Sequence, residues 1–387
     1  MQKKAVMEKV CSVLAGLLAF SACTVSAPDI KPGTPFYEED ISLRSVAEML
    51  SRLPLEKEHL QEVYNAAESS AGNGYDEEYL VKDIFEAPGC GVGDGQETRA
   101  VSRSAYAHPL RDLIREHLEK TRSTKSGASD VEDYIRRLQD SGYQLYIPYS
   151  DDWDGETLPI ITFDPGYGAE SNYGYEMIRT DDGIKVIDSV YVDEAVAMKR
   201  PVWVVNTNDD SAFTPLELYA KSGPQPGTKG VTRKLMLKSF KMLRNYDSWF
   251  GGASEFFVKL GSVDRFTAKT EADLRLYNPS VTDFMIVIRR CEKGKEVEFN
   301  TIMLSDFSNQ LDMMAFLVTE DDGGTTTSWK CSATVKINSK SYGFDLDIPY
   351  NDKDDIVWRG QLAASFFQEA DEVTGRFGDV EIGFALE

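Results

Sequence analysis

The chain has 387 residues, of which 42% are hydrophobic and 11% aromatic, and its formal net charge is −22. This length and this apolar content are enough for two or three domains with hydrophobic cores, and they exclude a disordered protein. A surface so acidic repels nucleic-acid phosphates and anionic lipid, so nucleic acid is not an expected partner. The acidic excess keeps such a protein soluble and also suits cations.

Residues 1–22 have the pattern of an export signal. Three lysines flank the start of an uncharged apolar run of thirteen residues, Val10–Ala22. The run is too short to cross a bilayer, which takes roughly 20 residues. The small residues Ser21 and Ala22 precede Cys23, as lipid attachment requires, so we predict a lipid anchor on Cys23 that holds the protein on the membrane. Cleavage after Ser21 would instead release a soluble protein.

A tether is predicted for residues 23–41, where prolines and a glycine oppose regular structure: Pro28, Pro32, Gly33 and Pro35. Residues Thr24–Ala27 lack the acidic cluster typical of surface export. We therefore expect a protein of the cell envelope, anchored in the outer membrane and facing the periplasm.

Residues 42–140 show apolar residues at helical spacing, for example Val46, Met49 and Leu50, and are predicted to be helical. The segment Asp76–Phe85 is expected to form a short helix. The glycine run Gly89–Gly95 does not fit a dinucleotide-binding fingerprint, since Asp94 stands where the third glycine is needed. A linker is the better interpretation of this run.

From residue 141 the apolar residues alternate, which predicts a β-rich region over 141–222 that packs with the helices. Residues 223–230 begin with Gly-Pro-Gln-Pro-Gly and form the clearest linker. Strand patterns separated by turn residues then fill 231–387, which predicts an antiparallel β-sandwich. A C2-like topology is one form that such a sandwich can take. The expected fold class is α+β.

Catalytic motifs are missing from the sequence. The three histidines show no metal-binding spacing, and there is no nucleophile elbow and no phosphate-binding loop. The sequence therefore favours a non-enzymatic protein. The alternative is a hydrolase acting on a glycan or peptide, with a site between the middle and C-terminal domains.

Two acidic turns of the last domain are candidates for calcium. Consecutive antiparallel strands reverse direction, so the loops before Trp329 and after Ile348 fall at one end of the sheet. Hard oxygen ligands on converging loops suit Ca²⁺. Polar turns without a metal are the alternative, because aspartate favours turns anyway. The candidate ligands are Asp321, Asp322, Asp352, Asp354 and Asp355.

Five cysteines are present. Cys291 and Cys331 fall near that same end of the sheet, so a disulfide between them is compatible with the topology and with an oxidising periplasm. Two small buried thiols are the alternative.

Aromatic residues are dense between Tyr143 and Tyr175, next to acidic hydrogen-bond acceptors. Such surfaces bind sugars or peptides. Tyr149, Asp152, Trp153 and Asp154 are the candidate ligand surface, and packing in the core is the alternative role for most of these aromatic residues.

Three segments, Tyr146–Gly155, Pro201–Asn206 and Tyr246–Glu255, resemble blocks of Bacteroidota-type cell-envelope lipoproteins, a family with no established activity. The resemblance spans most of the exported chain. It implies a lipoprotein with a sandwich domain and assigns no catalytic residue. The sequence thus predicts an exported, lipid-anchored envelope protein with a binding or structural role, for a glycan or protein ligand, and with calcium in its sandwich loops.

Overall fold

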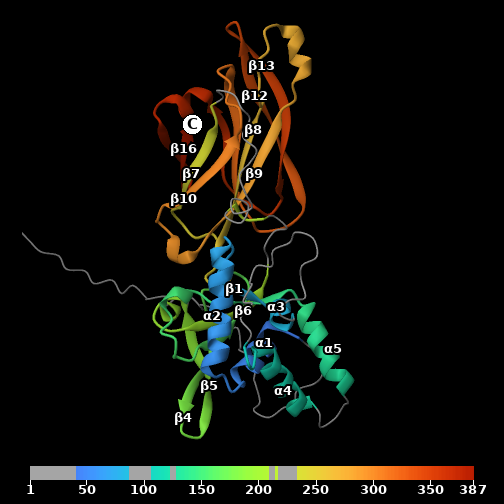
Figure 1. The fold of residues 1–387 in the computed structure, drawn as a ribbon, viewed down its shortest axis with the longest axis vertical. Coiled ribbons are helices and arrows are strands. Elements are labelled where there is room, and N and C mark those ends of the chain that lie inside the picture. Colours follow the sequence, from blue (N-terminus) through green and yellow to red (C-terminus); the bar gives the residue numbers. More distant parts are fainter. Residues whose placement is uncertain (1–40, 87–105, 123–127, 209–213, 217–232) are drawn as a thin grey trace, which may run out of the picture. The chain divides into compact units, whose positions relative to one another are not determined.

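The computed structural model describes residues 41–86, 106–122, 128–208, 214–216 and 233–387 (Figure 1). Its fold is mixed α+β, which confirms the predicted class: helices come first, and several antiparallel sheets follow in the C-terminal half. The predicted signal, all but the last residue of the tether, the run Gly89–Gly95 and the linker 223–230 lie outside the described residues.

The N-terminal part, residues 41–208, combines helices with one sheet. Its helices are α1 (Leu43–Ser51), α2 (Lys57–Gly72), α3 (Val81–Phe85), α4 (Leu110–Arg122), α5 (Ala128–Gln139) and α6 (Glu194–Ala197). Its strands are β1 (Glu78–Leu80), β2 (Tyr143–Tyr146), β3 (Ile160–Phe163), β4 (Ser171–Thr180), β5 (Gly183–Asp193) and β6 (Val202–Thr207). The strand order is β1-β2-β6-β3-β4-β5, and only β3 and β6 are parallel.

The helix expected over Asp76–Phe85 is wrong in its first half. Glu78–Leu80 is strand β1, which pairs with β2, and helix α3 begins only at Val81. All three residues of β1 are buried, and buried backbone groups must be hydrogen-bonded. Pairing with β2 satisfies them and overrides the local helical tendency.

Strand β6 is apolar on both faces because both faces are covered. Trp203 and Val205 point into the cluster that contains the helices, whereas Val202 and Val204 point into a second cluster on the other face. Alternate residues of a strand face opposite sides of its sheet. Helices α1–α5 cover one side, and Ala197 of α6 together with residues of the C-terminal part covers the other.

The C-terminal part, residues 233–387, is a sandwich of two antiparallel sheets. The first has the order β10-β7-β16-β15, and the second has the order β13-β12-β11-β8-β9 with β14 also paired to β11. Its strands are β7 (Leu235–Met242), β8 (Ser254–Ser262), β9 (Ser280–Ile288), β10 (Val297–Leu304), β11 (Leu311–Glu320), β12 (Thr326–Ile337), β13 (Lys340–Asn351), β14 (Asp355–Ala363), β15 (Glu372–Phe377) and β16 (Val380–Leu386). Short 3-10 turns are η2 (Glu271–Leu276), η3 (Arg290–Glu292) and η4 (Ala364–Gln368), and η1 (Ser150–Asp152) lies in the N-terminal part.

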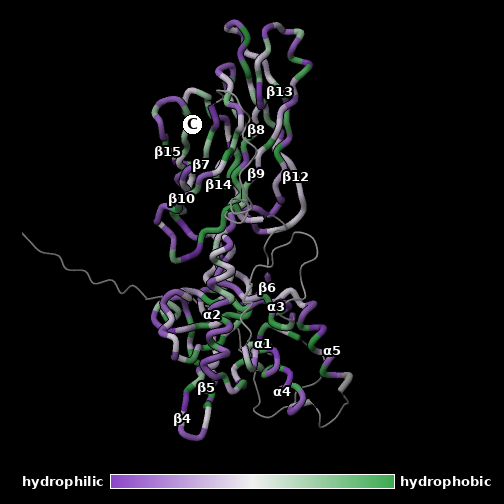
Figure 2. Tube along the Cα trace, in the orientation of Figure 1, coloured by the Kyte–Doolittle hydropathy of each residue, from purple (hydrophilic) through white to green (hydrophobic). Residues whose placement is uncertain are grey.

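Large apolar side chains from both sheets fill the sandwich core. Phe240 and Phe384 of the first sheet meet Phe256 and Phe316 of the second, and all four are 0% exposed. Hydrophobic residues accordingly follow the sandwich strands in Figure 2, whereas the tip of the β4–β5 hairpin is hydrophilic. Within the described residues, no helix has the length and apolar character needed to span a membrane.

The loop between β7 and β8, residues 243–253, packs against the N-terminal part and is called the docking loop below. Trp249 and Phe250 of this loop are 0% exposed and pack into the second face of the N-terminal sheet, with Val202 and Val204. Their ring centroids lie 4.0 Å apart. The second sheet face is therefore completed by residues that the sandwich supplies.

We expect Trp249→Ala to lower the free energy of unfolding by about 3–5 kcal/mol, because it empties a fully buried aromatic site. Denaturant unfolding followed by circular dichroism measures this change. Leu276→Ala, at a residue that is 72% exposed, is the matched control and should stay within about 0.5 kcal/mol of the wild type. Equal stability of W249A and wild type would contradict the packing described for the docking loop.

Candidate functional site

The docking loop is held on the N-terminal sheet by hydrogen bonds as well as by apolar contact. Nε1 of Trp249 donates to the carbonyl of Glu170 over 2.9 Å. The side-chain amide of Asn206 donates to the carbonyls of Phe250 and Gly251, each over 3.0 Å. These bonds satisfy backbone groups that the contact removes from water, and they fix the direction of the loop.

Asp76 binds the end of the docking loop. Its Oδ2 accepts a hydrogen bond from the backbone N–H of Ala253 over 2.9 Å, and its Oδ1 accepts one from Glu77 N–H over 2.8 Å. Gly252 has φ +120°, and a Cβ there would come within 2.5 Å of Oδ2 of Asp76. Glycine at position 252 is thus needed both for its backbone conformation and for the close approach of Asp76.

Glu77 joins the same contact. Its Oε1 accepts hydrogen bonds from N–H and Oγ–H of Ser150, over 3.0 Å and 2.9 Å. Nη1 of Arg289 lies 3.8 Å from that oxygen and 3.4 Å from Oδ2 of Asp151. Burial raises the pKa of Glu77 to about 7, and the nearby charge of Asp76 adds to the shift. Burial likewise raises the pKa of Asp76 to about 6.

Arg290 links both parts of the chain to the docking loop. Its Nε donates to Oε1 of Glu194 over 2.8 Å, and its Nη1 donates to the carbonyl oxygen of Asp247 over 3.0 Å. The hydroxyl of Tyr149 donates to the same carboxylate over 3.0 Å. Burial opposes ionisation of Glu194, but the hydrogen bond and charge of Arg290 hold its pKa below the usual value.

A group of carboxylates lies on the sandwich side of the docking loop. One carboxylate oxygen from each of Asp247, Glu255 and Glu320 lies within 4.8 Å of the others. Glu255 is near the start of β8 and Glu320 is the last residue of β11, which pairs with β8. Within the described chain, this is the set of side chains with the geometry to hold a metal ion.

The two acidic turns predicted to converge do lie side by side. Nδ2 of Asn351 is 3.3 Å from Oδ1 of Asp321, and Asp352 accepts a hydrogen bond from Thr325 N–H over 2.8 Å. Asp354 is buried and accepts from Asn351 N–H over 2.9 Å. Burial raises the pKa of Asp354 to about 6, and it also raises that of Asp322. Asp355 begins strand β14 and pairs with Glu320.

These five aspartates are therefore neighbours of the carboxylate group, but they do not form it. In the part of the chain that the structure describes, they serve mainly as acceptors within turns. The calcium interpretation of Asp321, Asp322, Asp352, Asp354 and Asp355 stays a prediction.

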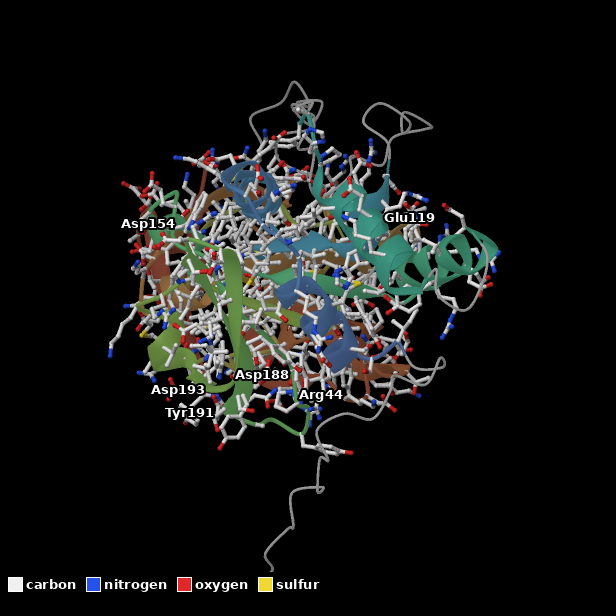
Figure 3. All side chains as sticks on the ribbon, turned by 90° about the horizontal axis from the view of Figure 1, so that it is seen from below. Arg44, Glu119, Asp154, Asp188, Tyr191 and Asp193 are labelled. Carbon is white, nitrogen blue, oxygen red and sulfur yellow. The ribbon has the colours of Figure 1, made fainter. Side chains whose placement is uncertain are left out.

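The four residues of the predicted ligand surface have different surroundings. Tyr149 takes part in the contact with Glu194, and the ring of Trp153 stacks on Tyr64 with centroids 4.0 Å apart. Asp152 is exposed. Asp154 lies at the surface (Figure 3), where it accepts hydrogen bonds from the backbone N–H groups of Glu156 and Thr157.

Cys291 and Cys331 are free thiols in the structure, so the disulfide that the sequence allows is not formed. Strand β12 begins at Thr326, which places Cys331 in the middle of the strand and not near its end. There its Sγ lies 3.7 Å from the carbonyl oxygen of Leu346, whereas Cys291 lies in η3 between Arg290 and Glu292.

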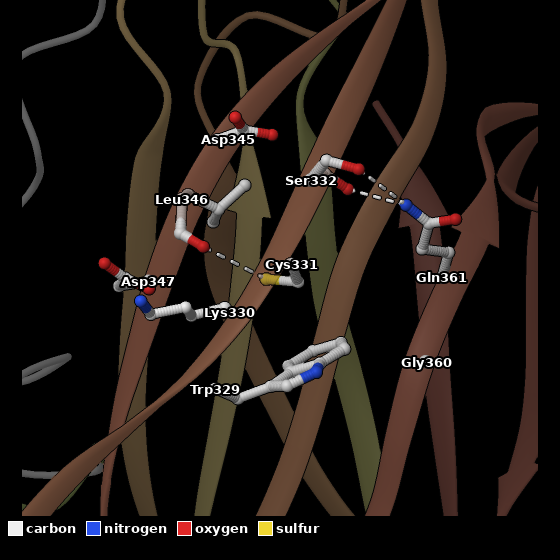
Figure 4. Close-up of a pocket in the computed structure, with 9 residues that line it drawn as sticks. All are labelled: Trp329, Lys330, Cys331, Ser332, Asp345, Leu346, Asp347, Gly360 and Gln361. Carbon is white, nitrogen blue, oxygen red and sulfur yellow. Dashed lines mark hydrogen bonds between the residues drawn. The ribbon is translucent and has the colours of Figure 1, made fainter.

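An open groove of about 870 Å³ lies on the sandwich between β12, β13 and β14 (Figure 4). Strand β12 pairs with β11 only near Val335 and Thr334, after which β14 takes over that edge of β11. Strands β12 and β11 therefore separate beyond this point. Nε2 of Gln361 in β14 connects β14 to β12 by donating to the carbonyl of Ser332 over 2.7 Å. The groove is lined by Trp329, Lys330, Cys331, Ser332, Asp345, Leu346, Asp347, Gly360 and Gln361.

Comparison with protein-family models, with curated proteins and with solved structures gives no match.

Sequence reasoning missed Asp247, Glu255 and Glu320. Two of them lie in the segment Tyr246–Glu255, and the third directly precedes the acidic turn at Asp321. The available signal was an acidic residue near the end of each of two paired strands, Glu255 in β8 and Glu320 in β11. It is weak, because the partner on the docking loop comes close only after the loop has folded back.

The raised pKa values of Asp76 and Glu77 make the stability of the fold depend on pH. A carboxyl whose pKa is higher in the folded state binds protons there that the unfolded chain has released, so the free energy of unfolding falls as pH rises. The window for Glu77 runs from 4.5 to about 7. The effect of this one group is on the order of 3 kcal/mol.

We expect Glu77→Gln to flatten this dependence between pH 4.5 and 7, measured as the free energy of unfolding in urea at several pH values. Asp188→Asn changes an exposed carboxylate (Figure 3) and should keep the wild-type slope. An E77Q slope equal to that of the wild type would show that Glu77 is not desolvated at the contact.

Proposed function

We propose that the chain is an exported protein, anchored to the cell envelope by a lipid on Cys23, whose folded part has a non-enzymatic binding or structural role. The anchor is supported by the signal pattern of residues 1–23. An outer-membrane position facing the periplasm is the corresponding location. Neither an enzyme activity nor a nucleic-acid partner forms part of the proposal.

The main structural support is that the acids with near-neutral pKa values are engaged in holding the fold. Asp76 accepts two backbone hydrogen bonds, one of them from the docking loop, and Glu77 accepts two from Ser150. A general acid or base must instead reach a substrate proton. Asp76 and Glu77 are only 4% and 2% exposed, so their position favours a structural role.

The groove beside Trp329 is the surface that best suits a ligand. The Trp329 side chain is half-buried, and charged groups of both signs flank it at Lys330, Asp345 and Asp347. An aromatic face next to hydrogen-bonding side chains is typical of sites that bind sugars and peptides. A glycan or an extended protein segment is accordingly the proposed ligand.

The rival function is hydrolysis at the contact between the two parts. It is favoured by one observation: two buried carboxyl groups with pKa values of about 6 and about 7 lie where that site was expected. Perturbed pKa values gather at catalytic sites, although structural networks produce them as well.

The lipid anchor is tested by mass spectrometry of the mature protein from a host that makes lipoproteins. We expect a chain that begins at Cys23 and carries the mass of acyl groups, recovered with membranes. Cys23→Ser should be recovered in the soluble fraction. An unmodified wild-type chain that begins at Ala22 would rule out lipidation.

Ligand binding is tested on arrays of oligosaccharides and peptides. We expect saturable binding without turnover, and Trp329→Ala should weaken it at least about tenfold, because an aromatic anchor is lost. Tyr191→Ala, at an exposed aromatic residue of β5 (Figure 3), is the control and should bind as the wild type does. Hydrolysis of a bound ligand that E77Q abolishes without unfolding the protein would support the rival function.

A further inference from the structure

The carboxylates Asp247, Glu255 and Glu320 come together through the fold of the sandwich. Strands β8 and β11 are antiparallel neighbours, and the backbone N–H of Asp321 donates to the carbonyl of Glu255 over 2.9 Å. This pairing places Glu255 and Glu320 at the same end of the sheet. Asp247 reaches them from the docking loop, so that one oxygen of each residue lies within 4.8 Å of the others.

The buried carboxylate of Glu320 is the feature that indicates a bound ligand. Its side chain is only 1% exposed, and among the described residues its Oε1 has no hydrogen-bond partner and its carboxylate has no ion pair. A buried carboxylate without a counter-charge is costly, and it either neutralises or binds a cation. The carboxylate of Asp247 adds negative charge next to Glu320.

The surroundings of Glu320 increase the need for positive charge. The carboxylates of Asp322 and Asp355 also act on Glu320 electrostatically. Arg244 pairs with Asp355 and Asp379, at 3.8 Å and 3.7 Å, and Nη1 of Arg290 donates to the backbone oxygen of Asp247. Oδ1 of Asn245, two residues before Asp247, is likewise buried without a donor among the described residues.

The donor atoms select the kind of cation. All three side chains offer carboxylate oxygen, which is a ligand for hard cations such as Ca²⁺ and Mg²⁺. Oxygens bound to one Ca²⁺ lie at most about 5 Å apart, since each is about 2.4 Å from the ion, whereas the limit for Mg²⁺ is about 4 Å. The three oxygens lie within 4.8 Å of one another, which is inside the limit for Ca²⁺.

We infer that Asp247, Glu255 and Glu320 form a site for a divalent cation of the calcium type, in which Glu320 is the buried anchor. Backbone oxygens and water complete the six to eight ligands that Ca²⁺ takes. This site differs from the turn aspartates predicted from the sequence, which surround it. It depends neither on the lipid anchor nor on the groove beside Trp329.

The inference is tested with the purified full chain, freed of metal with EDTA. Calorimetric titration with CaCl₂ at pH 8 should show one binding event, and thermal unfolding should move to higher temperature with CaCl₂ and less with MgCl₂. Glu320→Gln keeps the side-chain shape and removes the anchor charge. We expect it to fold and to bind Ca²⁺ at least about tenfold more weakly.

Asp188→Asn is the control, because it removes the same charge from an exposed residue of β5, and it should bind Ca²⁺ as the wild type does. The double variant Asp247→Asn with Glu255→Gln provides a second test if E320Q does not fold, and it should also lose the response. Absence of Ca²⁺ binding by the wild type would overturn the inference. So would E320Q and the double variant binding as tightly as the wild type.

Discussion

The second face of the N-terminal sheet is the constraint on which the rest of the structure depends. Val202 and Val204 of β6 point away from the cluster that contains α1–α5, and Ala197 of α6 contributes one small side chain to their apolar cover. Trp249 and Phe250 provide the large side chains of this cover from a loop of the sandwich. Burying two large aromatic side chains is worth several kcal/mol. The contact therefore makes the N-terminal core depend on a segment that follows it in sequence by more than forty residues.

Polar and charged residues surround this contact because the docking loop buries its own polar backbone groups there. A loop brings polar backbone groups into a buried place, and each of these groups needs a partner. Asp76 and Asn206 act as partners for N–H and C=O groups of the loop, and Arg290 binds the carbonyl of Asp247. In a chain of net charge −22, the adjacent residues Arg289 and Arg290 balance the carboxylates that would otherwise repel one another across the contact.

The sequence predicts the fold class, the order of helical and β-rich regions and most sandwich strands, because these depend on local periodicity. It does not predict β1, whose three residues become a strand only through pairing with β2. The apolar pattern over Gln361–Phe367 would also suggest a strand, but only its start belongs to β14, which ends at Ala363, and residues from Ala364 form η4. The sequence also does not predict the carboxylate group, since Asp247 and Glu320 are far apart in sequence and meet only because the docking loop folds back. The convergence of the acidic turns was accessible, because it requires only the alternation of neighbouring strands.

The two groups of acidic residues on either side of the docking loop differ in how their buried carboxylates are compensated. Burial raises the pKa of Asp76 and of Glu77, but hydrogen bonds and the charge of Arg289 favour their ionised forms. Both carboxyl groups can therefore carry a negative charge in the folded protein. Oε1 of Glu320 has no hydrogen-bond partner among the described residues, and further carboxylates act on this group. A cation bound by Asp247, Glu255 and Glu320 would compensate this charge. Asp247 belongs to the carboxylate group with Glu255 and Glu320, and its carbonyl oxygen also accepts a hydrogen bond from Arg290. A cation bound by this group therefore acts directly on the docking loop, which packs the sandwich against the N-terminal sheet.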